Sequence, residues 1–223
     1  RSNPAAFPMG VSQTSCYIWL QQAFLVLFRL YIFDNEIFEC VRSGNVAYEL
    51  CRPADTYYMW LASTMAMRLS KVLLRCVPIL IVGLCMPKPY GIALPENAAA
   101  MLWFFVSMLI GWLVVSALGM IVYMSAFFTV SVEGIKVVGC SLVEFLAGQI
   151  LPIPFFPPAI RTILEWLPFS SIQNVPLLIY SGDISGGELY WKVGLQIVWA
   201  IVLLAIGKAM YRKGVHRVVL QGG

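Results

Sequence analysis

Residues 137–169 decide the fold, and they read VVGCSLVEFLAGQILPIPFFPPAIRTILEWLPF. This apolar stretch is interrupted by four prolines, resumes as a short amphipathic run over 159–167, and breaks again at Pro168. A helix needs about 20 apolar residues to cross a bilayer, and the first proline comes before that length is reached. Unpaired backbone inside lipid costs several kcal/mol per group, so irregular chain persists there only where protein or a cavity covers it. The broken helix therefore indicates a transporter or a channel and argues against a simple anchor.

The composition of the whole chain is that of a polytopic membrane protein. Of its 223 residues, 60% are hydrophobic and 12% are charged, where a soluble domain carries about 25% charged residues. The net charge of +4 is small and gives no reason to expect nucleic-acid binding. The six cysteines form no Cys-x-x-Cys pair and there is one histidine, so no metal site is expected.

Five membrane-crossing segments are predicted within one transmembrane domain that takes up residues 1–223. They lie at about 14–33, 59–86, 99–125, 137–151 and 190–210, with a short outer helix at 159–167.

The orientation follows from the lysines and arginines, which concentrate on the cytoplasmic side of membrane proteins. With the C-terminus inside, eleven of the fifteen lie on the inner side, namely Arg29, Arg42, Arg52, Arg68, Lys71, Arg75, Lys136, Lys208, Arg212, Lys213 and Arg217. The four on the outer side are Arg1, Lys88, Arg161 and Lys192. Five crossings then leave Arg1 outside, so we expect a first membrane helix upstream of this numbering and six helices in the whole protein.

Charged side chains inside the predicted spans are candidates for function. Arg68, Lys71 and Arg75 recur at i, i+3 and i+7, so they are expected to share one helix face. They either extend to the inner headgroups, or line the inner mouth of a pathway, or steady the cytoplasmic segment. Glu144 has either a structural hydrogen-bonded role or a place in the pathway, unless its span is misplaced.

Two pairs of residues predict contacts of helices. Ser107 and Gly111 are four residues apart and fit a close helix–helix contact that requires small residues. Arg161 and Glu165 have the i, i+4 spacing of an ion pair on the outer helix.

The cytoplasmic segment 34–55 reads DNEIFECVRSGNVAYELCRPAD and combines mixed charge with interleaved apolar residues. It predicts two short amphipathic helices bent at Ser43–Gly44, with Gly44 in the left-handed conformation. Asn45 is expected to cap the second helix and Pro53 to stop it. The segment is either a polar loop on the headgroups or a docking surface for a soluble partner, and its mixed charge favours the docking surface.

Several kinds of catalytic chemistry have no motif in the chain. It contains no Gly-x-x-x-x-Gly-Lys-Ser/Thr loop for phosphates, no His-Glu-x-x-His and no Gly-x-Ser-x-Gly. If ATP supplies energy, another chain must bind it.

Five short blocks between residues 40 and 223 match one family in the same order. They are Arg42-Ser43-Gly44-Asn45 with Leu50-Cys51-Arg52-Pro53, Phe127-Phe128-Thr129 with Glu133-Gly134-Ile135, Gly148-Gln149-Ile150-Leu151-Pro152 with Pro157, Leu167-Pro168-Phe169 with Pro176 and Tyr180-Ser181-Gly182, and Arg217-Val218-Val219-Leu220-Gln221-Gly222-Gly223. The chain resembles the membrane subunit of an ABC-2-type transporter, in the branch of bacterial drug and antibiotic exporter permeases.

The resemblance implies an all-α integral membrane bundle of the ABC-2 type (type V exporter-like), with a broken, re-entrant fifth native span. It also implies a cytoplasmic coupling helix that contacts an ATPase, with the residues Glu39, Arg42, Gly44, Asn45, Glu49, Arg52 and Pro53. Candidates for the pathway or its gate are Glu144, Gln149, Pro152, Phe155 and Phe156.

The expected function is that of a permease subunit in an ATP-driven exporter of the bacterial cytoplasmic membrane. It would move an amphipathic small molecule, antibiotic, peptide or lipid, with a second permease subunit (identical or different) and two nucleotide-binding ATPase subunits. ATP and Mg²⁺ would be held by the ATPase, with no cofactor or enzyme activity in this chain. The alternatives are a non-transporting assembly or sensor subunit and a lipid-modifying membrane enzyme.

Overall fold

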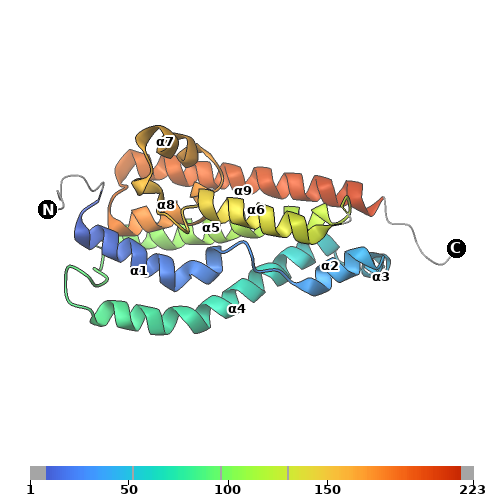
Figure 1. Cartoon of the computed structure of the whole chain (residues 1–223), viewed down its shortest axis with the longest axis horizontal. Coiled ribbons are helices and arrows are strands. Elements are labelled where there is room, and N and C mark those ends of the chain that lie inside the picture. The colour runs from blue at the N-terminus through green and yellow to red at the C-terminus, as the bar shows by residue number, and fades with distance from the viewer. Residues whose placement is uncertain (1–8, 52, 96, 130, 217–223) are drawn as a thin grey trace.

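The computed structural model describes residues 9–51, 53–95, 97–129 and 131–216, and within these ranges every regular element is a helix. The five longest are α1 (Val11–Phe28), α4 (Thr56–Cys85), α5 (Ala98–Ser125), α6 (Val132–Leu146) and α9 (Gly186–Val215). They lie side by side along the long axis of the molecule (Figure 1). The expected all-α class is therefore confirmed.

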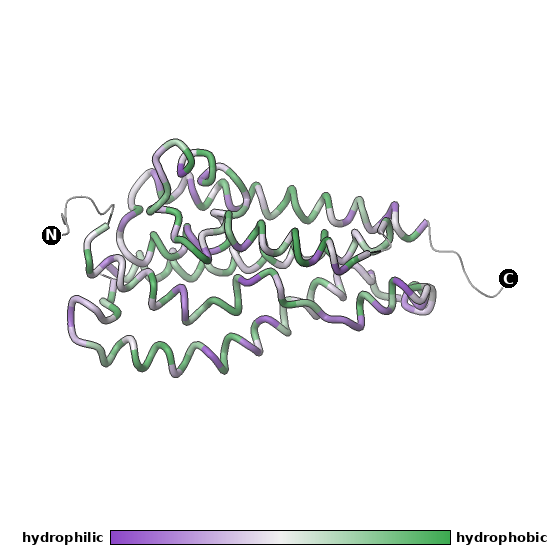
Figure 2. Tube along the Cα trace, in the orientation of Figure 1, coloured by the Kyte–Doolittle hydropathy of each residue, from purple (hydrophilic) through white to green (hydrophobic). Residues whose placement is uncertain are grey.

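Short helices occupy the two ends of this bundle. At one end are α2 (Asn35–Arg42) and α3 (Val46–Leu50), and at the other are α7 (Pro158–Trp166) and α8 (Ser170–Ser181) (Figure 1). We call these the α2–α3 end and the α7–α8 end. Figure 2 shows hydrophobic residues along the bundle and a hydrophilic stretch at the α2–α3 end.

Two of the described helices, α5 and α9, are both long enough and apolar enough to cross a membrane. The 30-residue helix α4 has the length, but Arg68, Lys71 and Arg75 interrupt its apolar character. The predicted number of five crossings therefore stays a prediction.

Helix α5 lies at the centre of the bundle, where it packs against α4, α8 and α9. A Cβ atom on Gly111 would lie 2.3 Å from the Ile172 carbonyl oxygen, so α8 approaches α5 more closely than any other residue would allow. Ser107 Oγ donates a hydrogen bond to Gln196 Oε1 of α9 at 2.8 Å. The close contact expected at Ser107 and Gly111 is thus made within the chain.

Helix α8 was not expected from the sequence. All residues from Ser170 to Tyr180 are buried, although the helix contains Pro176. Gly182 ends it with a φ of +78°, which is the left-handed conformation that favours glycine. This buried helix fills the bundle beside the broken span.

The broken span also differs in its bounds from the expected crossing 137–151. Helix α6 begins at Val132, ends at Leu146 and turns at Gly148, whose φ is +77°. Gln21 Nε2 donates to the carbonyl oxygens of Gly148 and Gln149, at 3.2 and 2.9 Å. Because Gln21 lies near the middle of α1, the break begins inside the bundle and ahead of Pro152, where it was expected to begin.

Candidate functional site

The two short helices predicted for residues 34–55 are present as α2 and α3. Asp34 caps α2 by accepting a hydrogen bond from the Glu36 backbone N–H at 2.9 Å. Gly44 has a φ of +77°, so the expected left-handed turn is confirmed. Ile37 and Phe38 face the bundle and are buried.

The opposite face of this segment is exposed and carries mixed charge. Glu39 and Arg42 are exposed and pair at 3.4 Å. Tyr48 of α3 is 77% exposed, and Leu50 is exposed as well. We call this surface the docking face, and it is formed by the exposed residues Glu36, Glu39, Arg42, Tyr48 and Leu50 and by the half-buried Glu49.

Three other predicted coupling residues have different outcomes. Asn45 stands at the start of α3, but its side chain makes no capping hydrogen bond, so that part of the prediction is wrong. Pro53 is exposed and follows α3, which already ends at Leu50. Arg52 lies outside the described residues.

The linker that joins α1 to α2 is held by a buried arginine. Arg68 of α4 is 0% exposed, and its guanidinium donates to the carbonyl oxygen of Arg29. It also donates to the carbonyl oxygens of Leu30 and Ile32, at 3.4 and 3.2 Å. One side chain of α4 thus binds three backbone positions of the linker.

Helices α5 and α6 hold the same region. The Asp34 backbone N–H donates to Tyr123 Oη at 2.5 Å, and the Tyr123 and Phe38 rings lie 4.7 Å apart. Lys136 Nζ of α6 lies 4.0 Å above the centre of the Phe38 ring. The start of α2 is therefore fixed to three helices of the bundle.

The expected basic stripe on α4 is divided. Arg68 is buried, whereas Lys71 and Arg75 are exposed, so the three side chains do not form one exposed surface. The physical reason is that the linker after α1 crosses α4 and covers it at Arg68, and no described element covers it at Arg75.

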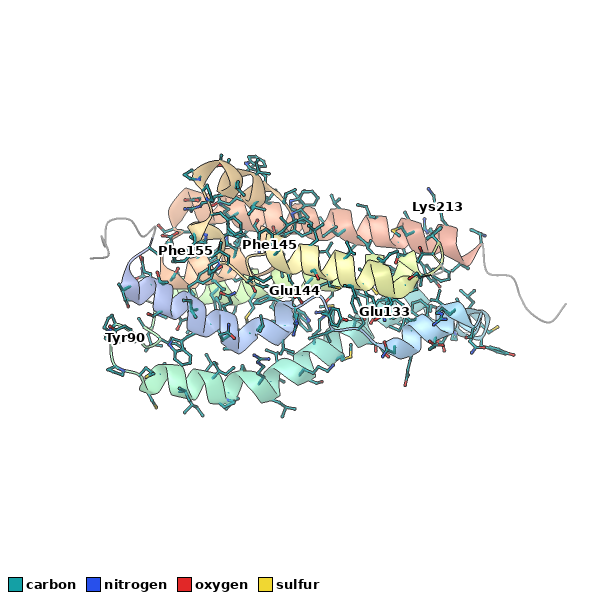
Figure 3. The ribbon with its side chains drawn as sticks, viewed as in Figure 1. Tyr90, Glu133, Glu144, Phe145, Phe155 and Lys213 are labelled. Atoms are coloured by element: carbon teal, nitrogen blue, oxygen red, sulfur yellow. The ribbon has the colours of Figure 1, made fainter. Side chains whose placement is uncertain are left out.

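A concave polar surface adjoins the docking face. A cavity of about 380 Å³ lies between α2 and the start of α6. Its lining includes the ion pairs Glu39–Arg42 at 3.4 Å and Glu133–Lys136 at 3.2 Å. Figure 3 shows Glu133 at the α2–α3 end of α6 and Glu144 farther along the bundle. From the sequence, Lys136 was expected on the inner side and Glu133 belonged to a block shared with the family, but neither residue was expected beside α2.

Two of the pathway candidates tie the broken span to α1. Glu144 Oε1 accepts a hydrogen bond from Arg29 Nε at 2.9 Å, and the Glu144 side chain is 18% exposed. Gln149 Nε2 donates to the Phe28 carbonyl oxygen at 2.9 Å. Both contacts hold the end of α6 against the end of α1.

The other pathway candidates lie in the irregular chain after α6. Pro152 precedes a single turn of 3₁₀ helix over Ile153–Phe155. The Phe156 ring packs edge-on against Phe145, with the ring centres 5.6 Å apart. Figure 3 shows Phe145 and Phe155 in the same part of the bundle.

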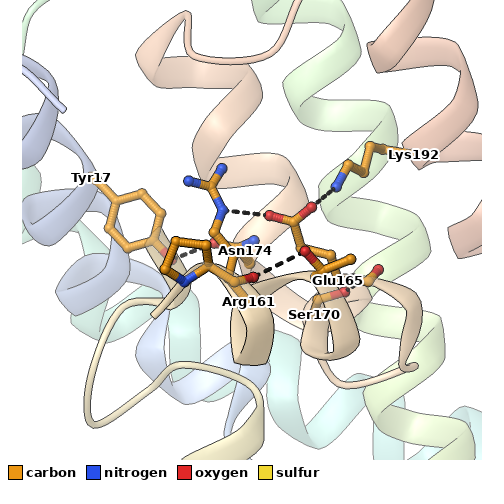
Figure 4. Close-up of polar contacts among 8 residues, drawn as sticks. Tyr17, Arg161, Glu165, Ser170, Asn174 and Lys192 are labelled. Carbon is orange, nitrogen blue, oxygen red and sulfur yellow. Dashed lines mark hydrogen bonds and ion pairs between the residues drawn. The ribbon is translucent and has the colours of Figure 1, made fainter. Parts of the chain in front are cut away.

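At the α7–α8 end an ion cluster joins α7 to α9 (Figure 4). The expected pair is confirmed, because Arg161 Nε donates to Glu165 Oε1 at 2.7 Å. Lys192 of α9 donates to the other carboxylate oxygen of Glu165 at 2.5 Å. Burial alone would raise the pKa of Glu165, but the hydrogen bonds from Lys192 and Arg161 outweigh it and hold the pKa below its ordinary value.

A larger cavity of about 590 Å³ opens at the α7–α8 end, between the starts of α1, α5 and α9 and the end of α8. Its described lining combines the aromatic residues Trp103, Tyr180 and Tyr190 with the uncharged polar residues Ser12 and Gln13. The surface is therefore amphipathic.

No group of three His, Cys, Asp or Glu side chains is placed to hold a metal ion in the part of the chain that the structure describes.

A family model described as ABC-2 family transporter protein matches residues 12–222, almost the whole chain. No curated protein and no solved structure that was compared matches it. Permeases of this family generally pair with an ATP-binding subunit. The chain therefore belongs to the ABC-2 family of transporter proteins, as the membrane permease component of an ABC transporter.

Proposed function

We propose that this permease exports an amphipathic cargo and is driven by a separate ATPase subunit that contacts the docking face of α2 and α3. The observation that carries the proposal is the two-sided build of this segment. Its outer side exposes mixed charge with Tyr48 and Leu50, whereas its inner side is fixed to the bundle by Arg68 and Tyr123. A loop that only rested on headgroups would need no such attachment, and lipid would favour a mainly basic face.

ATP hydrolysis by the partner subunit supplies the energy, because this chain has no phosphate-binding loop. Two ATPase subunits with ATP and Mg²⁺ would serve two permease subunits, which are identical or different. Closure of the ATPase pair on ATP would push α2 and rock the permeases between inward and outward access. The charged side chains Lys71 and Arg75, exposed along α4, are suited to a surface that faces water or a second subunit rather than lipid.

The orientation that fits this proposal has the α2–α3 end and the C-terminus in the cytoplasm of a bacterial cell. It follows from the excess of lysine and arginine at that end. Helix α7 then covers the outer end as a cap, and the ion cluster around Glu165 holds it to α9. The amphipathic cavity of about 590 Å³ at the same end suits an amphipathic cargo.

A sensor or assembly subunit could share the docking face but would need no re-entrant segment. Here the break and α8 place Ser170–Tyr180 in the interior of the bundle, which favours a transporter. A lipid-modifying enzyme would need acids or histidines gathered at one membrane face, and the described acids Glu144 and Glu165 are instead engaged in ion pairs.

The test changes the docking face without touching the anchor. Glu49→Lys reverses a charge on α3, and Gly44→Pro forces a φ near −65° where the turn requires +77°. We expect both variants to fold and to lose the coupling between ATP hydrolysis and transport. The measurement is cargo-stimulated ATP hydrolysis by the ATPase that co-purifies with the permease, reconstituted in lipid.

The matched control is Glu188→Lys, the same charge reversal at an exposed position in the first turn of α9. It should behave as the parent, because it lies at the α7–α8 end. Stimulated hydrolysis that stays at the parental rate in both docking-face variants would contradict the proposal.

A further inference from the structure

The geometry points to Arg68 as the positioning residue that makes α4 move together with the α2–α3 segment. This inference rests on the proposed function, because it names the side chain that transmits a displacement of α2 by the ATPase to the helices of the bundle.

The first support is the set of atoms that Arg68 binds. Helix α1 ends at Phe28, so the carbonyl groups of the linker that follows lie outside its helical hydrogen-bond ladder. The Arg68 guanidinium supplies donors to the carbonyl oxygens of Arg29, Leu30 and Ile32. Its planar fork can bind several acceptors at once, which the single nitrogen of lysine does not reproduce.

The second support is the cost of separating these groups. Arg68 is 0% exposed, its Nε has no hydrogen-bond partner, and no described carboxylate lies within ion-pair distance. An uncompensated buried charge costs several kcal/mol, so the linker carbonyl groups are what make the charge tolerable. A linker that moved away from α4 would strip the cation of these acceptors. The two parts are therefore bound to move as one body.

The third support is a contact with α5 that also holds the start of α2 against the bundle. Tyr123 Oη accepts the Asp34 backbone N–H at 2.5 Å, directly at the cap of α2. The Tyr123 ring also packs edge-on against Phe33, with the ring centres 5.4 Å apart. The start of α2 is thus held from α4 and from α5, and displacement of α2 is passed to both.

The test measures the distance between the α2–α3 turn and α4 in the permease bound to its co-purifying ATPase. Ser43 of the turn and Leu74 of α4 are exposed and lie outside the docking face, so each can be replaced by a ketone-bearing amino acid and spin-labelled without use of the native cysteines. Distance distributions are recorded by pulsed electron paramagnetic resonance without nucleotide and after trapping with ADP and vanadate. In the parent we expect a narrow distribution with the same mean in both states.

The informative variant is Arg68→Gln, and the matched control is Arg75→Gln, which removes an exposed cation from the same helix. Arg68→Gln should broaden the distribution and make its mean differ between the two nucleotide states. Arg68→Lys should restore part of the parental behaviour. Tyr123→Phe keeps the ring and loses the acceptor for Asp34, so it should broaden the distribution even if Arg68→Gln fails to fold.

A general loss of stability would lower the melting temperature but would not make the distance depend on nucleotide. The inference is overturned if the parental distance changes between the states, or if Arg68→Gln and Tyr123→Phe keep the parental width. If no ATPase co-purifies with the parent, the proposed function fails, and the widths without nucleotide still decide whether Arg68 holds the linker to α4.

Discussion

Glu165 shows how a single carboxylate can hold a short helix in place. Each of its oxygen atoms accepts a hydrogen bond from a different cation, Arg161 on its own helix and Lys192 on α9. Its side chain is 19% exposed, so water screens these contacts only in part. The two hydrogen bonds favour the charged carboxylate, so they lower the pKa of Glu165 and stabilise the folded state in which they form.

The sign of the pH dependence follows from that depression. A carboxylate whose pKa is lower in the folded state stabilises the fold fully above its unfolded pKa, about 4.3 for glutamate. The contribution is lost as the pH falls through the lower, folded pKa of Glu165. We expect the melting temperature of the purified permease to fall in this acid range, and Glu165→Gln to remove that part of the fall.

At neutral pH, Glu165→Gln should cost about 1.5–3 kcal/mol, the range for hydrogen bonds to charged groups. Thermal unfolding followed by circular dichroism measures both effects. Glu188→Gln serves as the control, because Glu188 is exposed in the first turn of α9. Equal pH profiles for the parent and Glu165→Gln would mean that the cluster does not stabilise α7.

The same residues show which contacts a sequence can predict. The pair Arg161–Glu165 is visible as an i, i+4 spacing on a helix. Lys192 is 27 positions from Glu165, and only the packing of α7 on α9 brings the two together. Arg68 likewise was grouped with Lys71 by helical spacing, but the linker that buries it comes from a distant part of the chain.

At the scale of elements, α8 was missed because proline normally argues against a helix interior. Pro176 lacks the N–H that would bind the Ile172 carbonyl oxygen four residues earlier, so this oxygen is left without its helical partner. It faces the bare Cα of Gly111 on α5 instead. The serines at its start and Gly182 at its end are typical of helix ends, but they predict α8 only once its packing against α5 is known.

This contact gives a prediction for the packing of α8 on α5. Gly111→Ala would place a Cβ atom 2.3 Å from the Ile172 carbonyl oxygen, which is backbone and cannot turn aside. Overpacking of this kind costs about 1–3 kcal/mol. We expect a lower melting temperature and faster cleavage of the 147–169 region by added protease.

The matched control is Gly194→Ala on α9, where a Cβ atom would meet no other atom within 4 Å. Alanine is favoured over glycine inside a helix by about 0.5–1 kcal/mol, so this variant should be neutral or slightly more stable. Equal melting temperatures for the two variants would show that α8 can move away from α5 without cost.

At the scale of the whole molecule, α9 connects the two ends. Near its start Lys192 binds Glu165 of α7, and near its end Lys208 forms an ion pair with Asp55, which caps α4 just after the docking face. The hydrogen bond from Lys208 is the main cause of the lowered pKa of Asp55. A helix of 30 residues rises about 45 Å, so one element reaches from the start of α4 to α7. Hydropathy predicts such a helix, but not the partners of Lys192 and Lys208.

The orientation of this whole arrangement can be tested with two of its own cysteines. Cys51 follows α3 and Cys85 ends α4, and both are exposed at opposite ends of the bundle (Figure 1). With the docking face in the cytoplasm, a membrane-impermeant maleimide added to intact cells should modify Cys85 and leave Cys51 unmodified. Permeabilisation should then expose Cys51, and mass spectrometry of the purified protein identifies each site.

Two controls make this labelling decisive. Cys85→Ser should abolish the signal from intact cells, and Cys140, which is buried, should stay unmodified in both conditions. Modification of Cys51 in intact cells would place α2 and α3 outside, where no ATPase can reach them. That outcome would contradict both the docking proposal and the orientation inferred from charge. Protection of Cys51 in intact cells would instead support a cytoplasmic position of α2 and α3, where an ATPase can contact them.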